Sequence, residues 1–334
     1  MQKTFPTLLP RQSPGNSIDH SAISALTYSF PFYNVHEGFM ITTQGISSNL
    51  TPRRELPIGL FDSGVGGMTV LRAMREQLPN ESFLYLGDTA RMPYGTKGVE
   101  TVQRYSLEAA AKLVERGVKL LVIACNTATA AALPAVQQAF PDIDVVGVVE
   151  PGAEAACKAT KSGYIAVIAT SGTIRGRAYE YAILRRMPEA RICAHACPLF
   201  VSMVEDGLLE GPLAEALAAR YLDQIFRDPR EQGLEVPDTL VLACTHFPLL
   251  RKAISHVVGE GVTLVDSAGI TARKVRGILQ EKHLARGSGP NVGIPLCPGS
   301  VRFLTTDDAP RFTRMGELFL GIPIAPCTVE VVEL

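Results

Sequence analysis

The sequence lacks three features that would point to a membrane protein, an exported protein or a nucleic-acid-binding protein. It has no run of the ~18 consecutive apolar residues that a membrane-spanning helix needs. Residues 1–10 contain no basic segment followed by an apolar core, so we expect no export signal. The 32 basic and 33 acidic residues nearly balance, which argues against a nucleic-acid-binding surface. We therefore expect a cytoplasmic protein that binds neither membranes nor nucleic acids.

Cysteine is present, but without the spacing of a structural metal site. The chain has seven cysteines, an odd number, and no Cys-x-x-Cys pair. Structural zinc sites usually draw on two such closely spaced pairs, so we expect no bound metal. An odd number of cysteines in a chain without an export signal favours free thiols in a reducing compartment over a disulfide framework.

A glycine-rich turn at residues 62–67 lacks the spacing of nucleotide-binding loops. It reads D-S-G-V-G-G and lies between an apolar segment, residues 58–61, and a helical pattern over residues 68–78. The turn matches neither G-x-G-x-x-G nor G-x-x-x-x-G-K-[ST]. We interpret it as a tight turn that holds Asp62 and Ser63 at the end of a strand.

Two apolar segments resemble each other, and each ends in Ala-Cys. Residues 120–127 read L-L-V-I-A-C-N-T, and residues 239–246 read T-L-V-L-A-C-T-H. Short, wholly apolar segments are typical of strands that are buried on both faces of a parallel sheet. Ligands of open α/β sheets bind beyond the carboxyl ends of such strands. We therefore expect Cys125 and Cys244 to lie in a ligand-binding site.

The order of expected strands and helices repeats in the two halves of the chain. Asp62 and Thr170 each follow the first strand of a half, and a similar length of chain separates each from its cysteine. This spacing indicates an internal duplication. In the second half, we expect a polar loop around Cys193 and Cys197.

The repeat predicts an α/β fold with two pseudo-symmetric domains, each a mostly parallel sheet flanked by helices. The active site is expected in the cleft between them. The predicted divisions are an N-terminal extension of poor order, residues 1–56; a first domain, residues 57–152 with 262–321; a second domain, residues 153–261; and a C-terminal tail, residues 322–334.

Two thiols on opposite sides of a cleft suit a reaction at a carbon atom between them. A free thiol titrates near pH ~8.5, and the start of a helix favours the thiolate. A thiolate can remove a proton from one side of the carbon while a thiol returns one from the other side, which inverts a stereocentre. The developing negative charge needs polar donors, and the candidates are Asn126, Thr127, Thr173 and Thr245. No motif for covalent attachment of pyridoxal phosphate is evident.

Four motifs, taken together and in order, resemble the cofactor-independent glutamate racemases. They are residues 61–67, Pro93-Tyr94-Gly95, residues 124–127 and residues 244–250, and the resemblance covers residues 58–321. It implies an isomerase that interconverts L-glutamate and D-glutamate without a cofactor and supplies D-glutamate for peptidoglycan synthesis. Relatives often dimerise, so a homodimer is a further expectation.

The resemblance also implies roles for individual residues. It implies that Cys125 acts on D-glutamate with help from Asp62, and that Cys244 acts on L-glutamate with help from His246. The implied substrate contacts are Asp62, Ser63, Tyr94, Gly95, Asn126, Thr127, Thr173, Thr245 and His246. Glu150, at the end of an expected strand, either assists His246 or is a solvated carboxylate.

Three alternatives stay open at this point. The first is a related two-cysteine racemase that acts on aspartate or another acidic substrate. The second is a non-catalytic protein that binds a small ligand in the same cleft. The third is a metal site formed by Cys125, Cys244 and His246.

Overall fold

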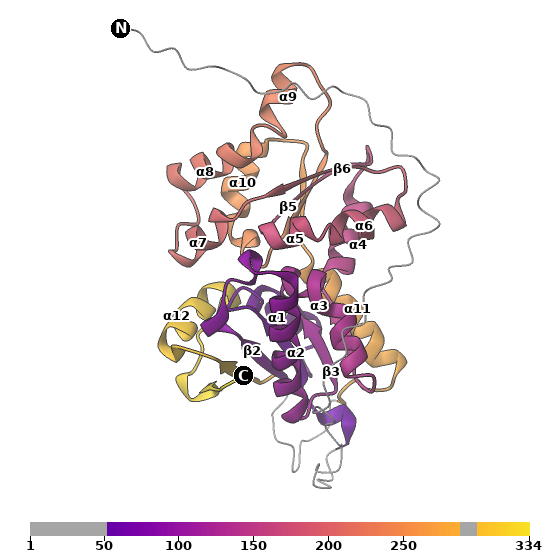
Figure 1. The fold of residues 1–334 in the computed structure, drawn as a ribbon, viewed down its shortest axis with the longest axis vertical. Coiled ribbons are helices and arrows are strands. Elements are labelled where there is room, and N and C mark those ends of the chain that lie inside the picture. The colour runs from indigo at the N-terminus through magenta and orange to yellow at the C-terminus, as the bar shows by residue number, and fades with distance from the viewer. Residues whose placement is uncertain (1–51, 288–298) are drawn as a thin grey trace. The chain divides into compact units, whose positions relative to one another are not determined.

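The computed structural model describes residues 52–287 and 299–334, which form two parallel β-sheets flanked by helices (Figure 1). The predicted α/β fold class is confirmed. Residues 1–51 of the predicted N-terminal extension lie outside the described residues, so the poor order expected for them stays a prediction.

The first sheet has six strands in the order β10-β9-β2-β1-β3-β4, and every neighbouring pair is parallel. The side chains of β1, β2 and β3 are buried along the whole strand. Burial on both faces explains why these strands read as continuous apolar runs. The strands are β1 (Ile58–Asp62), β2 (Phe83–Gly87), β3 (Leu120–Ile123), β4 (Asp144–Gly147), β9 (Val301–Thr305) and β10 (Val329–Val331).

The second sheet has four parallel strands in the order β6-β5-β7-β8. They are β5 (Tyr164–Ala169), β6 (Arg191–Ala196), β7 (Thr239–Ala243) and β8 (Thr263–Val265). This order matches the β2-β1-β3-β4 part of the first sheet, because in each case the first strand lies between the second and third. The two sheets therefore share a four-strand arrangement, which β9 and β10 extend in the first sheet only.

Helices connect the strands and flank the sheets (Figure 1). They are α1 (Met68–Gln77), α2 (Val99–Glu115), α3 (Asn126–Ala139), α4 (Val149–Ala159), α5 (Ser171–Arg175), α6 (Ala178–Arg186), α7 (Leu199–Glu205), α8 (Pro212–Leu222), α9 (Arg227–Glu231), α10 (Arg251–Val258), α11 (Ala268–Glu281) and α12 (Ala309–Leu320). Short 3₁₀ segments lie at Arg53–Glu55, Thr89–Arg91, Tyr94–Thr96, Phe247–Leu250 and Pro326–Thr328. In the described residues, none of the helices combines the length and the apolar character that crossing a membrane requires.

Three segments differ from the sequence expectations. The expected polar loop around Cys193 is instead the strand β6, whose side chains are half-buried or exposed, so its sequence lacks an apolar run. β8 pairs with β7 in the second sheet, although the predicted boundary assigns residues from 262 onward to the first domain. The predicted tail contains β10, which pairs with β9. β8 and β10 are three-residue strands with little burial, which gives them a weak sequence signal.

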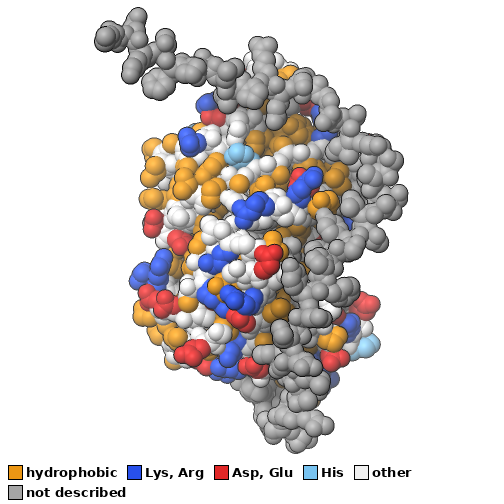
Figure 2. Space-filling model, in the orientation of Figure 1, with side chains coloured by type: hydrophobic (Ala, Val, Ile, Leu, Met, Phe, Trp, Pro, Cys, Tyr) orange, Lys and Arg blue, Asp and Glu red, His pale blue; other side chains and the backbone are white. Residues whose placement is uncertain are grey.

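Acidic and basic side chains are interspersed among hydrophobic ones on the face of the molecule in Figure 2. This distribution agrees with the near balance of 33 acidic and 32 basic residues in the chain.

Candidate active site

One cavity lies where strand ends of both sheets meet. Its volume is about 30 Å³, room for about two water molecules. The cavity is lined by Ser63, Met92, Pro93, Tyr94, Gly95, Cys125, Asn126, Thr127, Thr170, Val201, Ala243, Cys244, Thr245 and His246.

The structure brings the residues predicted from the sequence together at this cavity. Those that line it are Ser63, Tyr94, Gly95, Cys125, Asn126, Thr127, Cys244, Thr245 and His246. The other two are buried beside lining residues: Asp62 directly precedes Ser63, and Thr173 Oγ1 lies 3.1 Å from Thr127 Oγ1. Their individual roles remain predictions.

Cys125 follows β3 and caps the start of α3. Its sulfur accepts a hydrogen bond from the Ala128 amide at 3.5 Å and donates one to Ser63 Oγ at 3.7 Å. Burial and the negative charge of Asp62 raise the pKa of Cys125 to about 12, although the Ala128 amide acts in the opposite direction. The amide at the helix start thus favours the thiolate, as expected, but burial and Asp62 outweigh this one donor at Cys125.

Asp62 ends β1 and is fully buried. Its Oδ2 accepts a hydrogen bond from the Gly64 amide at 3.1 Å, whereas Oδ1 has no hydrogen-bond partner in the described part of the chain. Burial raises the pKa of Asp62 above its ordinary value, while the charge of His246 and the amides of the turn oppose this. A buried carboxylate with an unpaired oxygen beside a thiol is a candidate proton acceptor.

His246 connects Cys244 to a carboxylate. Its Nδ1 lies 3.9 Å from Cys244 Sγ, and its Nε2 lies 3.2 Å from Glu205 Oε1 at the end of α7. Burial alone would lower the pKa of His246, but Cys244, Glu205 and Asp62 together raise it to about 10. Near neutral pH the imidazole is therefore protonated, and it can stabilise a thiolate at Cys244.

Glu205, and not Glu150, is the carboxylate that contacts His246. Glu150 lies in the first turn of α4, where it pairs with Arg185 and Arg186 of α6. Glu205 is 41 residues from His246 in the sequence and belongs to a helix that carries no recognisable motif. The sequence therefore gave no signal for this contact.

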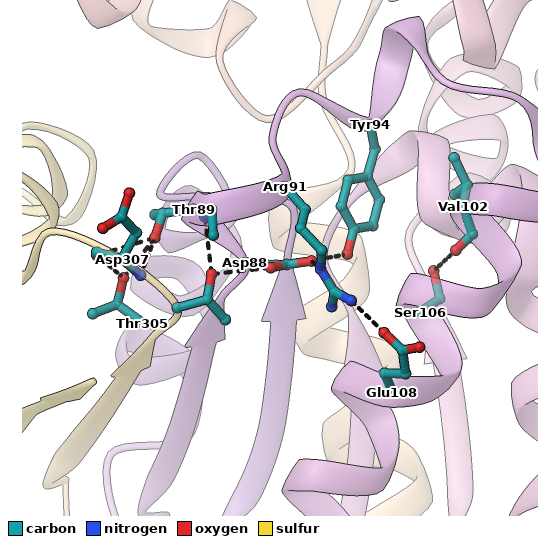
Figure 3. Close-up of polar contacts among 11 residues, drawn as sticks. Asp88, Thr89, Arg91, Tyr94, Val102, Ser106, Glu108, Thr305 and Asp307 are labelled. Atoms are coloured by element: carbon teal, nitrogen blue, oxygen red, sulfur yellow. Dashed lines mark hydrogen bonds and ion pairs between the residues drawn. The ribbon is translucent and has the colours of Figure 1, made fainter. Parts of the chain in front are cut away.

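Tyr94 lines the cavity, and its hydroxyl bonds to Asp88 (Figure 3). The hydroxyl donates to Asp88 Oδ2 at 2.5 Å, and Arg91 Nε donates to the same oxygen at 2.6 Å. Thr306 Oγ1 donates to the other oxygen at 3.0 Å, and Arg91 also pairs with Glu108. Asp88, which the motifs did not predict as a site residue, thus fixes the Tyr94 loop against α2 and the segment after β9.

Three threonine hydroxyls form a cluster that joins the two sheets at the cavity. Thr127 Oγ1 lies 2.9 Å from Thr170 Oγ1 and 3.1 Å from Thr173 Oγ1, and the last two lie 3.2 Å apart. Thr127 belongs to α3 after β3, whereas Thr170 and Thr173 follow β5. Thr170 lines the cavity but was not among the predicted site residues.

Two glycines of the motifs allow the loops of the two sheets to approach closely. A Cβ at Gly66 would lie 2.4 Å from Thr245 Oγ1 and 2.6 Å from His246 Nδ1. A Cβ at Gly95 would lie 2.5 Å from Thr170 Cβ. Both positions therefore need glycine because of contacts across the cavity, in addition to any need for a tight turn.

Comparison with known proteins gives consistent matches over most of the chain. The model of the Asp/Glu/Hydantoin racemase family matches residues 58–275. The chain is 50% identical over 264 residues to the glutamate racemase of Geobacter metallireducens, which covers 79% of this chain and 92% of that relative. It is 48% identical over 272 residues to the glutamate racemase of Beutenbergia cavernae, covering 80% and 90% of the two chains. The crystal structure of the glutamate racemase from Francisella tularensis in complex with D-glutamate has a TM-score of 0.74 and 32% identity, covering 84% and 98%.

The fold and the cavity define an α/β protein with two thiols at equivalent strand ends. The matches cover enough of the chain to assign it, and it belongs to the Asp/Glu/hydantoin racemase family. It is an amino-acid racemase, and therefore an isomerase. The family resemblance seen in the four sequence motifs is confirmed.

Proposed function

We propose that this protein interconverts L-glutamate and D-glutamate. The observation that carries the proposal is that Cys125 and Cys244, which follow equivalent strands of the two sheets, line one cavity. The relatives named above are glutamate racemases, and one of them was crystallised with D-glutamate. These likenesses support glutamate as the substrate.

In the proposed mechanism, the two thiols exchange protons with the α-carbon from opposite sides. With L-glutamate, the Cys244 thiolate takes the α-proton, and the Cys125 thiol gives its proton to the other face of the carbon. Cys244 then carries a proton, and Cys125 is a thiolate. D-glutamate reacts through the same steps in reverse, so every proton lost from carbon is replaced by one from sulfur.

The neighbours of each thiol suit these two roles. A protonated His246, 3.9 Å from Cys244 Sγ, stabilises the thiolate that acts on L-glutamate. Asp62 can accept the proton of Cys125 when Cys125 must act as a base. The proposed substrate contacts are Ser63, Tyr94, Gly95, Asn126, Thr127, Thr173 and Thr245, with Asp62 and His246. The hydroxyl, amide and backbone N–H groups of these contacts can donate hydrogen bonds that stabilise the negative charge developing on the substrate in the transition state.

The family resemblance also supports a role for this reaction in cell-wall synthesis. The proposed reaction supplies D-glutamate for peptidoglycan synthesis in the cytoplasm. A homodimer also stays a prediction, and sedimentation of the purified protein at several concentrations measures it directly.

Exchange of the α-proton in D₂O tests substrate and reaction together. Purified protein without added cofactor is incubated with each amino acid, and the Cα-proton signal is followed by proton NMR. Loss of the signal with glutamate but not aspartate supports the proposal, and the reverse result overturns it. Absence of exchange with every amino acid tested would indicate a binding protein. A chelator should leave the rate unchanged if Cys125, Cys244 and His246 act as acids and bases and not as metal ligands.

A further inference from the structure

A buried hydrogen bond connects a residue outside the cavity to one that lines it. The Tyr179 hydroxyl, on α6, donates to Asn126 Oδ1, at the start of α3, at 2.8 Å. Tyr179 is 3% exposed and Asn126 is 4% exposed. Because α3 follows a strand of the first sheet and α6 a strand of the second, the bond also joins helices of the two sheets.

The neighbouring helix α4, which lies beside α6 (Figure 1), has a glycine, Gly152, where the side chain of Tyr179 packs against it. A Cβ at Gly152 of α4 would lie 2.5 Å from the Tyr179 hydroxyl oxygen and 2.8 Å from Cε1 of its ring. Only glycine therefore leaves room for the hydroxyl in this position. Two residues before Gly152, Glu150 pairs with Arg185 and Arg186 and so holds α6 against α4. The Glu-Pro-Gly sequence at residues 150–152 thus places Tyr179.

The hydrogen bond decides which end of the Asn126 amide faces the cavity. Burial, together with the charges of Asp266 and Cys244, raises the pKa of Tyr179 well above its ordinary value, so the hydroxyl keeps its proton. That proton is donated to the carbonyl oxygen of the Asn126 side chain. The amide nitrogen, with two N–H donors, is then the group that Asn126 presents to the cavity.

We propose that Tyr179 is a positioning residue that holds the Asn126 amide with its N–H donors toward a substrate carboxylate. This inference rests on the proposed glutamate racemase function, in which an anionic substrate occupies the cavity. Without the tyrosine hydroxyl, the amide can rotate and present its carbonyl oxygen, which repels a carboxylate. Tyr179 therefore sets the affinity for substrate, although it does not itself line the cavity.

The Tyr179→Phe variant tests the role by removing only the hydroxyl. Steady-state kinetics with L-glutamate and with D-glutamate should show KM raised ~10-fold, which corresponds to about 1.4 kcal/mol, and kcat changed by less than about twofold. KM should rise for both enantiomers, because both carry the same carboxylates. Tyr181→Phe is the matched control: Tyr181 lies on the same helix, is 44% exposed, and should keep wild-type kinetics.

A second variant moves the hydroxyl without removing it. Gly152→Ala should push the Tyr179 ring away from Asn126 and raise KM in the same way. Alanine is otherwise favoured over glycine within a helix, so a lower affinity could not be attributed to a weaker helix. This variant also tests the proposal if Tyr179→Phe fails to fold.

The outcomes separate this inference from the proposed function. If the wild-type protein does not racemise glutamate, the proposed function fails. If the wild type is active and KM stays unchanged in Tyr179→Phe and in Gly152→Ala, the positioning role is refuted while the function stands. A fall in kcat and melting temperature at unchanged KM would show that Tyr179 is only structural, and this also refutes the role.

Discussion

At the scale of single residues, the two cysteines of the cavity lie in different electrostatic surroundings. Cys125 lies near the carboxylate of Asp62, and burial together with that charge raises its pKa to about 12. Cys244 lies 3.9 Å from His246, whose own pKa is raised to about 10 by Cys244, Glu205 and Asp62 against the effect of burial. One thiol is thus held protonated, while the other has a cation beside it. This arrangement suits an acid and a base on opposite sides of one substrate.

Removal of either thiol should abolish racemisation. In the proposed two-base mechanism, the Cys125→Ala and Cys244→Ala variants lack either the base or the acid for each direction of the reaction, so turnover should fall by ~10⁴-fold. The change in optical rotation of L-glutamate and of D-glutamate measures both directions. Cys157→Ala, a half-buried cysteine that does not line the cavity, is the matched control and should retain activity. Near-normal turnover in both directions in either catalytic variant would contradict the two-base mechanism.

Asp62→Asn should make the protein more stable and less active. Asp62 is fully buried, which disfavours its charged form and raises its pKa, and its Oδ1 has no hydrogen-bond partner in the described residues. A neutral amide removes the cost of burying that charge, so the free energy of unfolding at neutral pH should rise by about 1–3 kcal/mol. Activity should fall ~100-fold or more, because Cys125 loses the proton acceptor that we propose for it. Denaturant unfolding and racemase assays measure the two effects.

Asp88→Asn provides the comparison for this substitution. Asp88 is equally buried, but it accepts hydrogen bonds from Tyr94, Arg91 and Thr306. Its amide variant should therefore be less stable than the wild type, since at least one of these donors loses its partner. Equal loss of stability in both variants would show that Asp62 is not a strained, functional carboxylate.

At the scale of elements, the clearest sequence predictions concern strands that are wholly buried. β1, β3 and β7 read as short apolar runs because their side chains are buried along the whole strand, on both faces of the sheet. β6 was expected to be a loop, because this edge strand is half-buried and its sequence mixes charged, polar and apolar residues. Periodicity reports burial, so it identifies central strands better than edge strands.

The turn after β1 is predicted to be intolerant of even one added methyl group. Gly66→Ala places a Cβ 2.4 Å from Thr245 Oγ1 and 2.6 Å from His246 Nδ1. The clash should displace His246 from Cys244, so activity should fall ~10-fold or more, and overpacking should cost about 1–3 kcal/mol of stability. Gly277→Ala in α11 has no atom within 4 Å of the new Cβ and should keep full activity. Racemase assays and thermal melts of the two variants test this prediction, and a fully active Gly66→Ala enzyme would contradict it.

At the scale of the whole molecule, the raised pKa of His246 links folding to pH. The ordinary value is 6.5, and the value in the folded protein is about 10. Below pH 6.5 both states hold the proton, and the contribution of His246 to stability is fully present. As the pH rises toward 10, the unfolded state gives up the proton that the folded state keeps, so this contribution shrinks and is lost above pH 10.

His246→Gln should remove this pH dependence. The free energy of unfolding of the wild type and of the variant is measured by denaturant titration near pH 6.5 and near pH 10. The stability advantage of the wild type should be largest at the lower pH and should decrease at the higher one. His256→Gln, whose side chain is 72% exposed, controls for the substitution itself. A wild-type advantage that stays constant or grows with pH would refute the linkage.

The sequence by itself determined the buried parallel strands, the two Ala-Cys strand ends and the grouping of most cavity residues. These features are local, because an apolar run specifies burial and a strand end specifies where ligands bind. Only the tertiary structure decided which distant groups complete the site. Glu205 reaches His246 across 41 residues and Tyr179 reaches Asn126 across 53, through helix packing that no local pattern encodes. The different surroundings of the two thiols follow from that packing, since burial and neighbouring charge set each pKa.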